Sequence, residues 1–337
     1  MRIVHIVDSL EINGGSMMCF EIASAMRRML NYPVECLVVS KTGKYGRKGI
    51  LAKPFADAYG WKMPSINYAQ FKERSPEFRD DVILHHRLEC TRPLSFKKKP
   101  RLYLVINHTI QKLDRIQKFK NADLIVSVCE HLRHRSPRVR MPHKVVLNGI
   151  SQNKEQPVEK GGSFVTGRCH RLPSSKFSVE SLRFLDSMNL RSHIHYLAGP
   201  KLKEIVNYER KNPKSCLRYL QKLDDQKKKQ ALLRSFDLYL YDTYGPEGAS
   251  VAILEGVAAG VPVLCKPMGG NKELVRDGVN GFYYNKLQEA GQKIKYYYDH
   301  PDELEELKKN VEKDFKERLS VEKCVDKYYS LIEKWKK

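Results

Sequence analysis

The sequence predicts an α/β protein made of two domains, each a doubly wound parallel sheet. The chain has 337 residues, which suits two domains of ordinary size. Short apolar runs rich in β-branched residues alternate with longer amphipathic stretches, as in parallel strands covered by helices on both faces. This alternation pauses once, in the polar stretch 151–162, and then resumes. The pause marks the expected boundary between the domains.

The first domain is expected to span residues 1–150. Its strands are predicted at the runs RIVHIV, VECLVVS, DVILHH, RLYLVIN, ADLIVSV and KVVLNGI. Helices are expected between several of them, for example at residues 16–30 and 110–121. The stretch SQNKEQPVEKGG at 151–162 is polar and ends in two glycines, so it is predicted to be a linker.

The second domain is expected to span residues 163–315. Its strands are predicted at SFVTGRC, HIHYLAG, DLYLYDT, VPVLCKP and NGFYYN. Pro301 then opens a helix with acids in its first turn and bases later, the order that a helix dipole favours. A final helix is expected at 316–337.

The amino-acid composition limits the kinds of partner and the cellular locations that are expected for the protein. Hydrophobic residues make up 41% and charged residues 30%, which is typical of a globular protein. The formal net charge of +22 favours an anionic partner, such as nucleic acid, a lipid surface or a phosphorylated ligand. No apolar stretch reaches the roughly 18 residues of a membrane span. The opening MRIVHIVDSLE lacks the layout of a signal peptide, so a cytoplasmic location is expected.

Cysteines and histidines do not form a metal pattern in the sequence. No two of the eight cysteines are closer than 17 residues, which excludes a CxxC zinc knuckle, and they read as buried reduced thiols. The pairs His131 with His134 and His193 with His195 have no acids or cysteines beside them in a metal-ligand arrangement. No metal is expected.

A glycine-rich turn before an apolar helix is the most informative part of the chain. Residues 236–285 read as the strand DLYLYDT, the turn TYGPEGAS, the helix ASVAILEGVAAG and the strand VPVLCKP. Ligands of such sheets bind beyond the carboxyl ends of the strands. The N-terminus of a helix also offers unpaired N–H groups and a positive dipole end. We therefore expect an anionic ligand near this turn.

Two carboxylates in this segment need an explanation. Glu255 lies inside an otherwise uncharged helix, and Glu247 lies in the turn eight residues earlier. An ionised carboxylate is costly to bury without partners. Either backbone or arginine donors satisfy Glu255, or it faces a cleft and accepts hydrogen bonds from ligand hydroxyls. If the intervening residues are all helical, the carboxylates are roughly 12 Å apart, about the span of a sugar-nucleotide.

Several motifs follow one another in a fixed order along nearly the whole chain. They are INGGSMMCFEIASAM, KVVLNGIS, VTGRCHRLPSSK, EGASVAILE with its E-x7-E spacing, GVAAGVPVL, PMGGNKELV and RDGVNGFYY. Together they resemble the motifs of the retaining GT-B glycosyltransferases, family 4, also called glycosyl transferases group 1. The resemblance implies a GT-B fold, in which two Rossmann-like domains face each other across a cleft. It also implies that residues 1–150 bind the acceptor and residues 163–315 the nucleotide-sugar, with the last helix crossing back to the first domain.

The same resemblance implies roles for individual residues. Glu255 would bind the ribose hydroxyls, and Glu247 would lie near the sugar. Lys176, with Arg168 or Arg171, would neutralise the diphosphate, so no metal or other cofactor is needed. Arg168 precedes Lys176 by more residues than is usual in the family, which leaves the choice of arginine open; Arg168 is preferred because it follows Gly167 at a strand end. The remaining residues implied to hold the nucleotide-sugar are Gly14, Gly15, Gly248, Ala249, Ser250, Gly269, Gly270 and Asn271.

A histidine at the end of a strand is also implied in the site. The segment DDVILHHRLE resembles the family strand that ends in an active-site histidine, and its offset from Asp81 selects His86. His85 and His108 are the alternatives, since His108 ends the next strand. The implied role is a contact with the sugar through the side chain or a nearby backbone carbonyl, and not that of a nucleophile.

The implied activity is transfer of a hexose-like sugar from a nucleoside diphosphate, with a UDP-sugar preferred, and with retention of configuration. Residues 1–150 hold 27 Lys and Arg against 13 Asp and Glu, so the domain expected to receive the acceptor is the more basic one. An anionic or lipid-linked glycan at the inner face of a membrane would suit this charge. Two alternatives remain open: sugar transfer to modified bases of DNA, and a non-catalytic binding or scaffold subunit.

Overall fold

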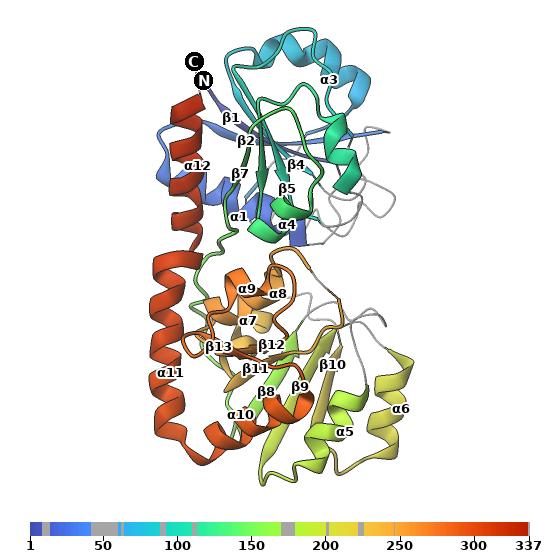
Figure 1. The fold of residues 1–337 in the computed structure, drawn as a ribbon, viewed down its shortest axis with the longest axis vertical. Helices are drawn as coiled ribbons and strands as arrows, with labels where there is room; N and C mark the ends of the chain where they lie inside the picture. Colours follow the sequence, from blue (N-terminus) through green and yellow to red (C-terminus); the bar gives the residue numbers. More distant parts are fainter. Residues whose placement is uncertain are drawn as a thin grey trace. The chain divides into compact units, whose positions relative to one another are not determined.

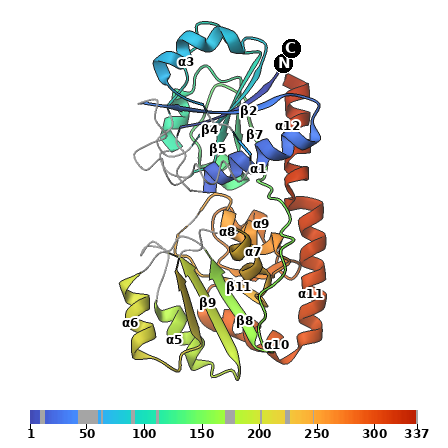
Figure 2. The same cartoon turned by 180° about the vertical axis from the view of Figure 1, so that it is seen from behind.

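The computed structural model describes residues 1–8, 14–41, 60–61, 64–87, 92–109, 113–169, 179–199, 202–221, 226–245 and 247–335. They form two compact units (Figures 1 and 2). The first unit comprises Met1–Ser151, Glu247–Ala249 and Leu319–Lys337, and the second comprises Gln152–Pro246 and Ser250–Arg318. The chain therefore leaves the first unit after residue 151, returns to it briefly at 247–249 and returns again from residue 319.

The first unit contains a seven-stranded sheet in the order β3-β2-β1-β4-β5-β6-β7, with every neighbouring pair parallel. Its strands are β1 (Ile3–Val7), β2 (Val34–Ser40), β3 (Ser65–Asn67), β4 (Val82–Arg87), β5 (Leu102–Asn107), β6 (Leu124–Ser127) and β7 (His143–Val145). All residues of β1, β5 and β6 are buried. The apolar runs are continuous because both faces of a parallel sheet are covered.

Helices and short helical turns connect these strands. They are α1 (Gly14–Met29), α3 (Tyr68–Arg74), the 3₁₀ turns η1 (Ser75–Phe78) and η2 (Leu113–Lys118), and α4 (Glu130–Arg135). Asn67 caps α3 in a capping box, in which its side chain accepts from the backbone of Gln70 and the Gln70 side chain accepts in return. The helix α12 (Val321–Trp335) packs against α1 and completes the unit.

The second unit contains a six-stranded parallel sheet in the order β10-β9-β8-β11-β12-β13. Its strands are β8 (Phe164–Cys169), β9 (His193–Gly199), β10 (Leu217–Gln221), β11 (Leu238–Tyr241), β12 (Val263–Cys265) and β13 (Gly281–Tyr283). Its helices are α5 (Val179–Ser187), α6 (Lys203–Lys211), α7 (Gln226–Arg234), α8 (Val251–Ala258), α9 (Asn271–Leu274), α10 (Leu287–Asp299) and α11 (Pro301–Asp314). A π-helical turn, η4 (Phe315–Leu319), follows α11. No helix in the described part of the chain combines the length and apolar character needed to cross a membrane.

The fold differs from the sequence expectations in three places. Strands β3 and β10 were not predicted; β3 has three half-buried residues and β10 carries polar residues, so neither gives a long apolar run. The helix expected at 110–121 is a 3₁₀ turn over its described part. Gly14 and Gly15, expected in a loop before a helix, begin α1.

The stretch 151–162, predicted to be a linker, contains no helix or strand and contacts the second unit. From residue 152 onward this stretch belongs to the second unit. The amide of Asn153 donates to the carbonyl of Ala258, and its side-chain nitrogen donates to the carbonyl of Gln230. The polar composition of this stretch does not predict the contact, because its polar groups bond to backbone groups of the second unit.

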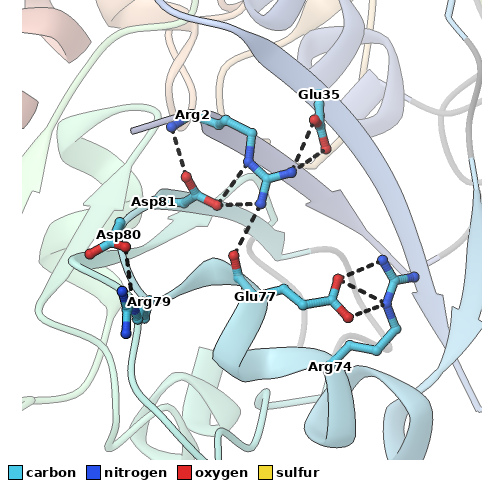
Figure 3. Close-up of polar contacts among 7 residues, drawn as sticks. All are labelled: Arg2, Glu35, Arg74, Glu77, Arg79, Asp80 and Asp81. Carbon is cyan, nitrogen blue, oxygen red and sulfur yellow. Dashed lines mark hydrogen bonds and ion pairs between the residues drawn. The ribbon is translucent and has the colours of Figure 1, made fainter.

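An ion pair fixes the N-terminal edge of the first sheet (Figure 3). Asp81 precedes β4 and is buried, and it accepts from the backbone nitrogen of Arg2 at 2.8 Å and from its Nη2 at 2.7 Å. Arg2 also reaches Glu35 in β2. The three strands β2, β1 and β4 are thus joined at one end by a single arginine.

We expect Asp81→Asn to lower the free energy of unfolding by about 2 kcal/mol, because the substitution removes a charge-assisted bond from a buried acceptor. Asp80→Asn is the matched control, since Asp80 is exposed and pairs with the exposed Arg79. Its effect should stay within about 0.5 kcal/mol. Urea unfolding measures both, and equal effects would contradict this role for Asp81.

Candidate functional site

Three charged residues lie where adjacent strands of the second sheet end. Arg168 lies near the end of β8, Asp242 directly follows β11 and Lys266 directly follows β12. Because β8, β11 and β12 are neighbours and parallel, their carboxyl ends share one edge of the sheet. This edge is where open α/β sheets bind ligands. Sequence analysis identified Arg168 but missed Asp242 and Lys266.

Asp242 is the centre of this charged group. It is buried, its Oδ1 accepts from Tyr284 at 3.2 Å, and the same oxygen lies 3.5 Å from Lys266 Nζ. Its other oxygen accepts from Ser181. The Lys266 ammonium also lies 4.2 Å from the centre of the Tyr244 ring. Lys266 is thus held by one carboxylate and one aromatic face.

Arg168 is almost fully buried beside the same carboxylate. Burial lowers its pKa, while nearby tyrosines and the charge of Asp242 act in the opposite direction. Its guanidinium lies 5.8 Å from the centre of the Tyr241 ring. The edge therefore carries two cations, Arg168 and Lys266, near one acid.

Glu255 lies on α8 and forms an ion pair with Lys229 of α7. The distance from Lys229 Nζ to Glu255 Oε1 is 2.6 Å, and the two side chains are 14% and 10% exposed. Burial alone would lower the pKa of Lys229, but the charge and hydrogen bond of Glu255 outweigh it and raise that pKa. Lys229 therefore stays protonated at neutral pH.

The pair gives Glu255 a partner within the protein. The basic run QKKKQ at 226–230 has the pattern of a solvated face, yet its third lysine, Lys229, is turned inward and paired. Glu255 was expected to have either protein donors or ligand hydroxyls as partners, and the structure supplies a protein cation. Since Lys229 takes one carboxylate oxygen, acceptor capacity remains on the carboxylate.

The turn before α8 is not helical. The helix begins at Val251, so the estimate of 12 Å between Glu247 and Glu255, made for a continuous helix, does not apply. Ser250 is the N-cap residue, but its hydroxyl donates to Tyr241 at 2.9 Å instead of capping the helix. Glu247–Ala249 belongs to the first unit, and a Cβ at Gly248 would lie 3.4 Å from the carbonyl oxygen of His108.

The loop after β12 carries Gly269, Gly270 and Asn271. Gly269 has a φ of +57°, a conformation that favours glycine. Gly270 is the N-cap residue of the four-residue helix α9. The amide of Asn271 donates to the carbonyl of Met268 at 3.1 Å, so this amide already has a protein acceptor. Asn271 itself is buried.

Three histidines form a hydrogen-bonded chain in the first unit. His5 Nδ1 lies 2.9 Å from His86 Nε2, and His86 Nδ1 lies 2.9 Å from His108 Nε2. Burial lowers the pKa of His5 and of His108 to about 3 and lowers that of His86 well below its usual value, so all three are neutral at pH 7. His86 thus has both ring nitrogens occupied by other histidines.

The three candidate histidines, His85, His86 and His108, have different surroundings in the structure. His85 faces the other side of the sheet, where its Nδ1 lies 2.8 Å from the Tyr103 hydroxyl and burial lowers its pKa to about 3. His86 is fully buried between two other histidines. His108 is half-buried, and its Nδ1 has no hydrogen-bond partner among the described residues.

The other residues singled out in the sequence either form local hydrogen bonds or lie outside the described residues. Lys176 and Arg171 fall outside the described residues. His193 and His195 both contact the Thr166 hydroxyl, at 2.9 and 2.8 Å, so they form a local hydrogen-bond group in the second sheet.

Comparison with known proteins gives the same architecture. Residues 196–314 match the family model described as glycosyl transferases group 1. The chain superposes on Anabaena HepE solved in complex with UDP, with a TM-score of 0.76 and 16% identity, covering 99% of this chain and 100% of that one. The fold is GT-B.

Two further structures and two curated relatives extend this comparison. A glycosyltransferase from Rickettsia africae gives a TM-score of 0.77 at 13% identity, covering 99% and 98% of the two chains. Sucrose-phosphate synthase from Thermosynechococcus elongatus gives 0.68 at 12%, covering 99% of each. The trehalose synthases of Thermococcus litoralis and Pyrococcus furiosus are each 29% identical over 86 residues. That match spans 26% of this GT-B chain and about a fifth of each relative, 21%.

The Glu255–Lys229 ion pair can be tested through its effect on the free energy of unfolding. We expect Lys229→Met to lower the free energy of unfolding by about 3–5 kcal/mol, because it leaves a carboxylate buried without its cation. The double variant Lys229→Met, Glu255→Leu should recover most of this loss. Lys228→Met, on an exposed neighbour, is the control. A double-mutant cycle in urea measures the coupling, and additive effects would show that the pair does not form.

Proposed function

We propose that the protein is a metal-independent, retaining glycosyltransferase that transfers a hexose-like sugar from a nucleoside diphosphate, preferably UDP. The observation that carries this proposal is the family match over 196–314, which spans Glu247, Glu255 and Lys266 in one segment. The buried charges of that segment lie on α8 and at the carboxyl edge of the second sheet. The structures of HepE with UDP and with UDP-glucose support the choice of nucleotide.

Glu255 is proposed to bind the ribose. Lys229 orients the carboxylate, and the remaining acceptor sites of the carboxylate suit two adjacent hydroxyls. Hydrogen bonds to a charged acceptor are stronger than those between neutral groups.

Lys266 and Arg168 are proposed to stabilise the departing diphosphate. The bond between the sugar and the phosphate oxygen breaks, and the electron pair stays on that oxygen. Fixed cations at this edge of the sheet stabilise the developing charge. The leaving phosphate oxygen then takes the proton of the attacking acceptor hydroxyl, on the same face, so configuration is retained. Lys176 and Arg171 remain sequence-based candidates for the same task.

In the first unit, His108 is proposed to contact the sugar, with His86 behind it. His108 adjoins the Glu247–Ala249 turn through its carbonyl, whereas the ring of His86 is enclosed by His5 and His108. His86 then acts by fixing the ring orientation of His108. Gly14, Gly15 and Gly248 are proposed to let the backbone approach the sugar and phosphates.

The acceptor is proposed to be anionic or lipid-linked. Cations of the first unit such as Arg92, Lys98, Arg135 and Arg140 are exposed. Vesicles that contain anionic lipid should therefore bind the protein in a salt-dependent way. Transfer to glucosylated or hydroxymethylated duplex DNA instead would select the nucleic-acid alternative.

Nucleotide binding tests the proposed donor site. We expect UDP and UDP-sugars to raise Tm in a panel that includes GDP- and ADP-sugars. Glu255→Ala should abolish the shift, because the ribose loses its acceptor. Glu306→Ala, on an exposed acid of α11, should leave the shift unchanged. Absence of any shift across the panel with the unmodified protein would favour a scaffold protein.

Turnover tests the proposed leaving-group cation. We expect Lys266→Met to lower kcat for sugar transfer or donor hydrolysis by about 10²-fold, because the cation acts on charge that develops in the transition state. Lys272→Met, on an exposed lysine of α9, is the matched control. Steady-state kinetics gives both values. A rise in KM without a fall in kcat would place Lys266 in ground-state binding instead.

A further inference from the structure

Four metal-ligating side chains meet between the first sheet and α1. His5 on β1 pairs in register with Cys36 on β2 and with Leu84 on β4. His86 lies two residues after Leu84, so it projects from the same face as His5 and Cys36. The helix α1 contributes Cys19, and all four side chains are buried. His5 was not identified by sequence analysis.

The donor atoms are already close together. His5, Cys19 and His86 each offer one donor atom that lies within 4.8 Å of the other two. Cys36 is in register with His5 on the neighbouring strand, and its thiol interacts with that of Cys19. Two nitrogen ligands of a tetrahedral zinc ion lie about 3.3 Å apart, since each bond is about 2.0–2.1 Å long. His5 Nδ1 and His86 Nε2, now 2.9 Å apart, need to separate by only about 0.4 Å.

The chemistry of the donors suits a borderline-soft divalent cation. Two thiolates balance the charge of Zn²⁺, which leaves no net charge in the core. Imidazole and thiolate together favour zinc over magnesium or calcium.

A second layer of contacts is also present. A histidine that binds a metal normally donates its other ring N–H to an acceptor, which fixes the ring. His86 Nδ1 lies 2.9 Å from His108 Nε2 and has this arrangement. His5 would carry its proton on Nε2. This nitrogen has no hydrogen-bond partner among the described residues.

We propose that His5, Cys19, Cys36 and His86 bind one Zn²⁺ ion as a closed structural site that ties α1 to strands β1, β2 and β4. Binding converts two thiols to thiolates and releases two protons to solvent, and four protein ligands leave no open position for a substrate. The site does not depend on the proposed glycosyl transfer, so either can fail without the other.

The experiment uses the full-length protein, stripped with a chelator and titrated with Zn²⁺. We expect one zinc per chain by elemental analysis, about two protons released per zinc in calorimetry across buffers of different ionisation enthalpy, and a Tm rise of about 5–10 °C at zinc concentrations 100-fold above Kd. With Co²⁺, a thiolate-to-metal absorption band and intense tetrahedral bands should appear.

Variants assign the ligands. Cys19→Ser and His5→Gln should abolish stoichiometric binding, and His108→Gln should weaken it by about 10–100-fold. Cys216→Ser, on a half-buried thiol of the second unit, should bind zinc like the unmodified protein. Equal binding by Cys19→Ser and the unmodified protein would overturn the proposal. If the ligand variants do not fold, the cobalt spectrum of the unmodified protein decides, and absence of the thiolate band overturns the proposal.

Discussion

The second unit keeps opposite charges paired in two places, between helices α7 and α8 and at the carboxyl edge of its sheet. Glu255 with Lys229, and Asp242 with Lys266, place opposite charges together where water is largely excluded. A buried ion pair seldom adds net stability, because the desolvation of both ions offsets their attraction. The two ion pairs are therefore expected to add little net stability to the second unit. The surrounding tyrosines, Tyr241 and Tyr284, fill the space that water would otherwise occupy.

Much of this arrangement was predictable from local sequence, and the remainder depends on contacts between distant residues. The long apolar strands and the buried helix α8 follow from hydrophobic runs, and Glu255 stood out because no other charge shares its helix. Its partner could not be found in this way, since Lys229 is 26 residues away in a run that resembles a solvated face. Asp242 and Lys266 were missed for a related reason: each follows a strand singly, and only the strand order β8-β11-β12 makes them neighbours.

In the first unit, successive side chains of a strand point to opposite faces of the sheet, and this distinguishes the adjacent candidates His85 and His86. His85 and His86 are consecutive in the chain, yet one bonds to Tyr103 on one face and the other to His5 and His108 on the opposite face. Sequence offset alone left this choice open. His5 gave no signal, because a single histidine in an apolar strand has the same local pattern whether it packs in a core or joins a cluster. The cluster exists only after β1, β4 and α1 have come together.

The connections between the two units have a consequence for synthesis on the ribosome. Ile150 pairs with Ser320, the amide of Ile150 donates to Leu319, and the amide of Val321 donates to Ile150, so the points of exit and re-entry are hydrogen-bonded neighbours. A Cβ at Gly149 would lie 2.2 Å from the carbonyl oxygen of Ser320, so glycine is required for this close approach. Because α12 follows the second unit in the chain, the nascent first unit lacks the helix that packs against α1 until the second unit has been translated. Its folding can be completed only after α12 has left the exit tunnel.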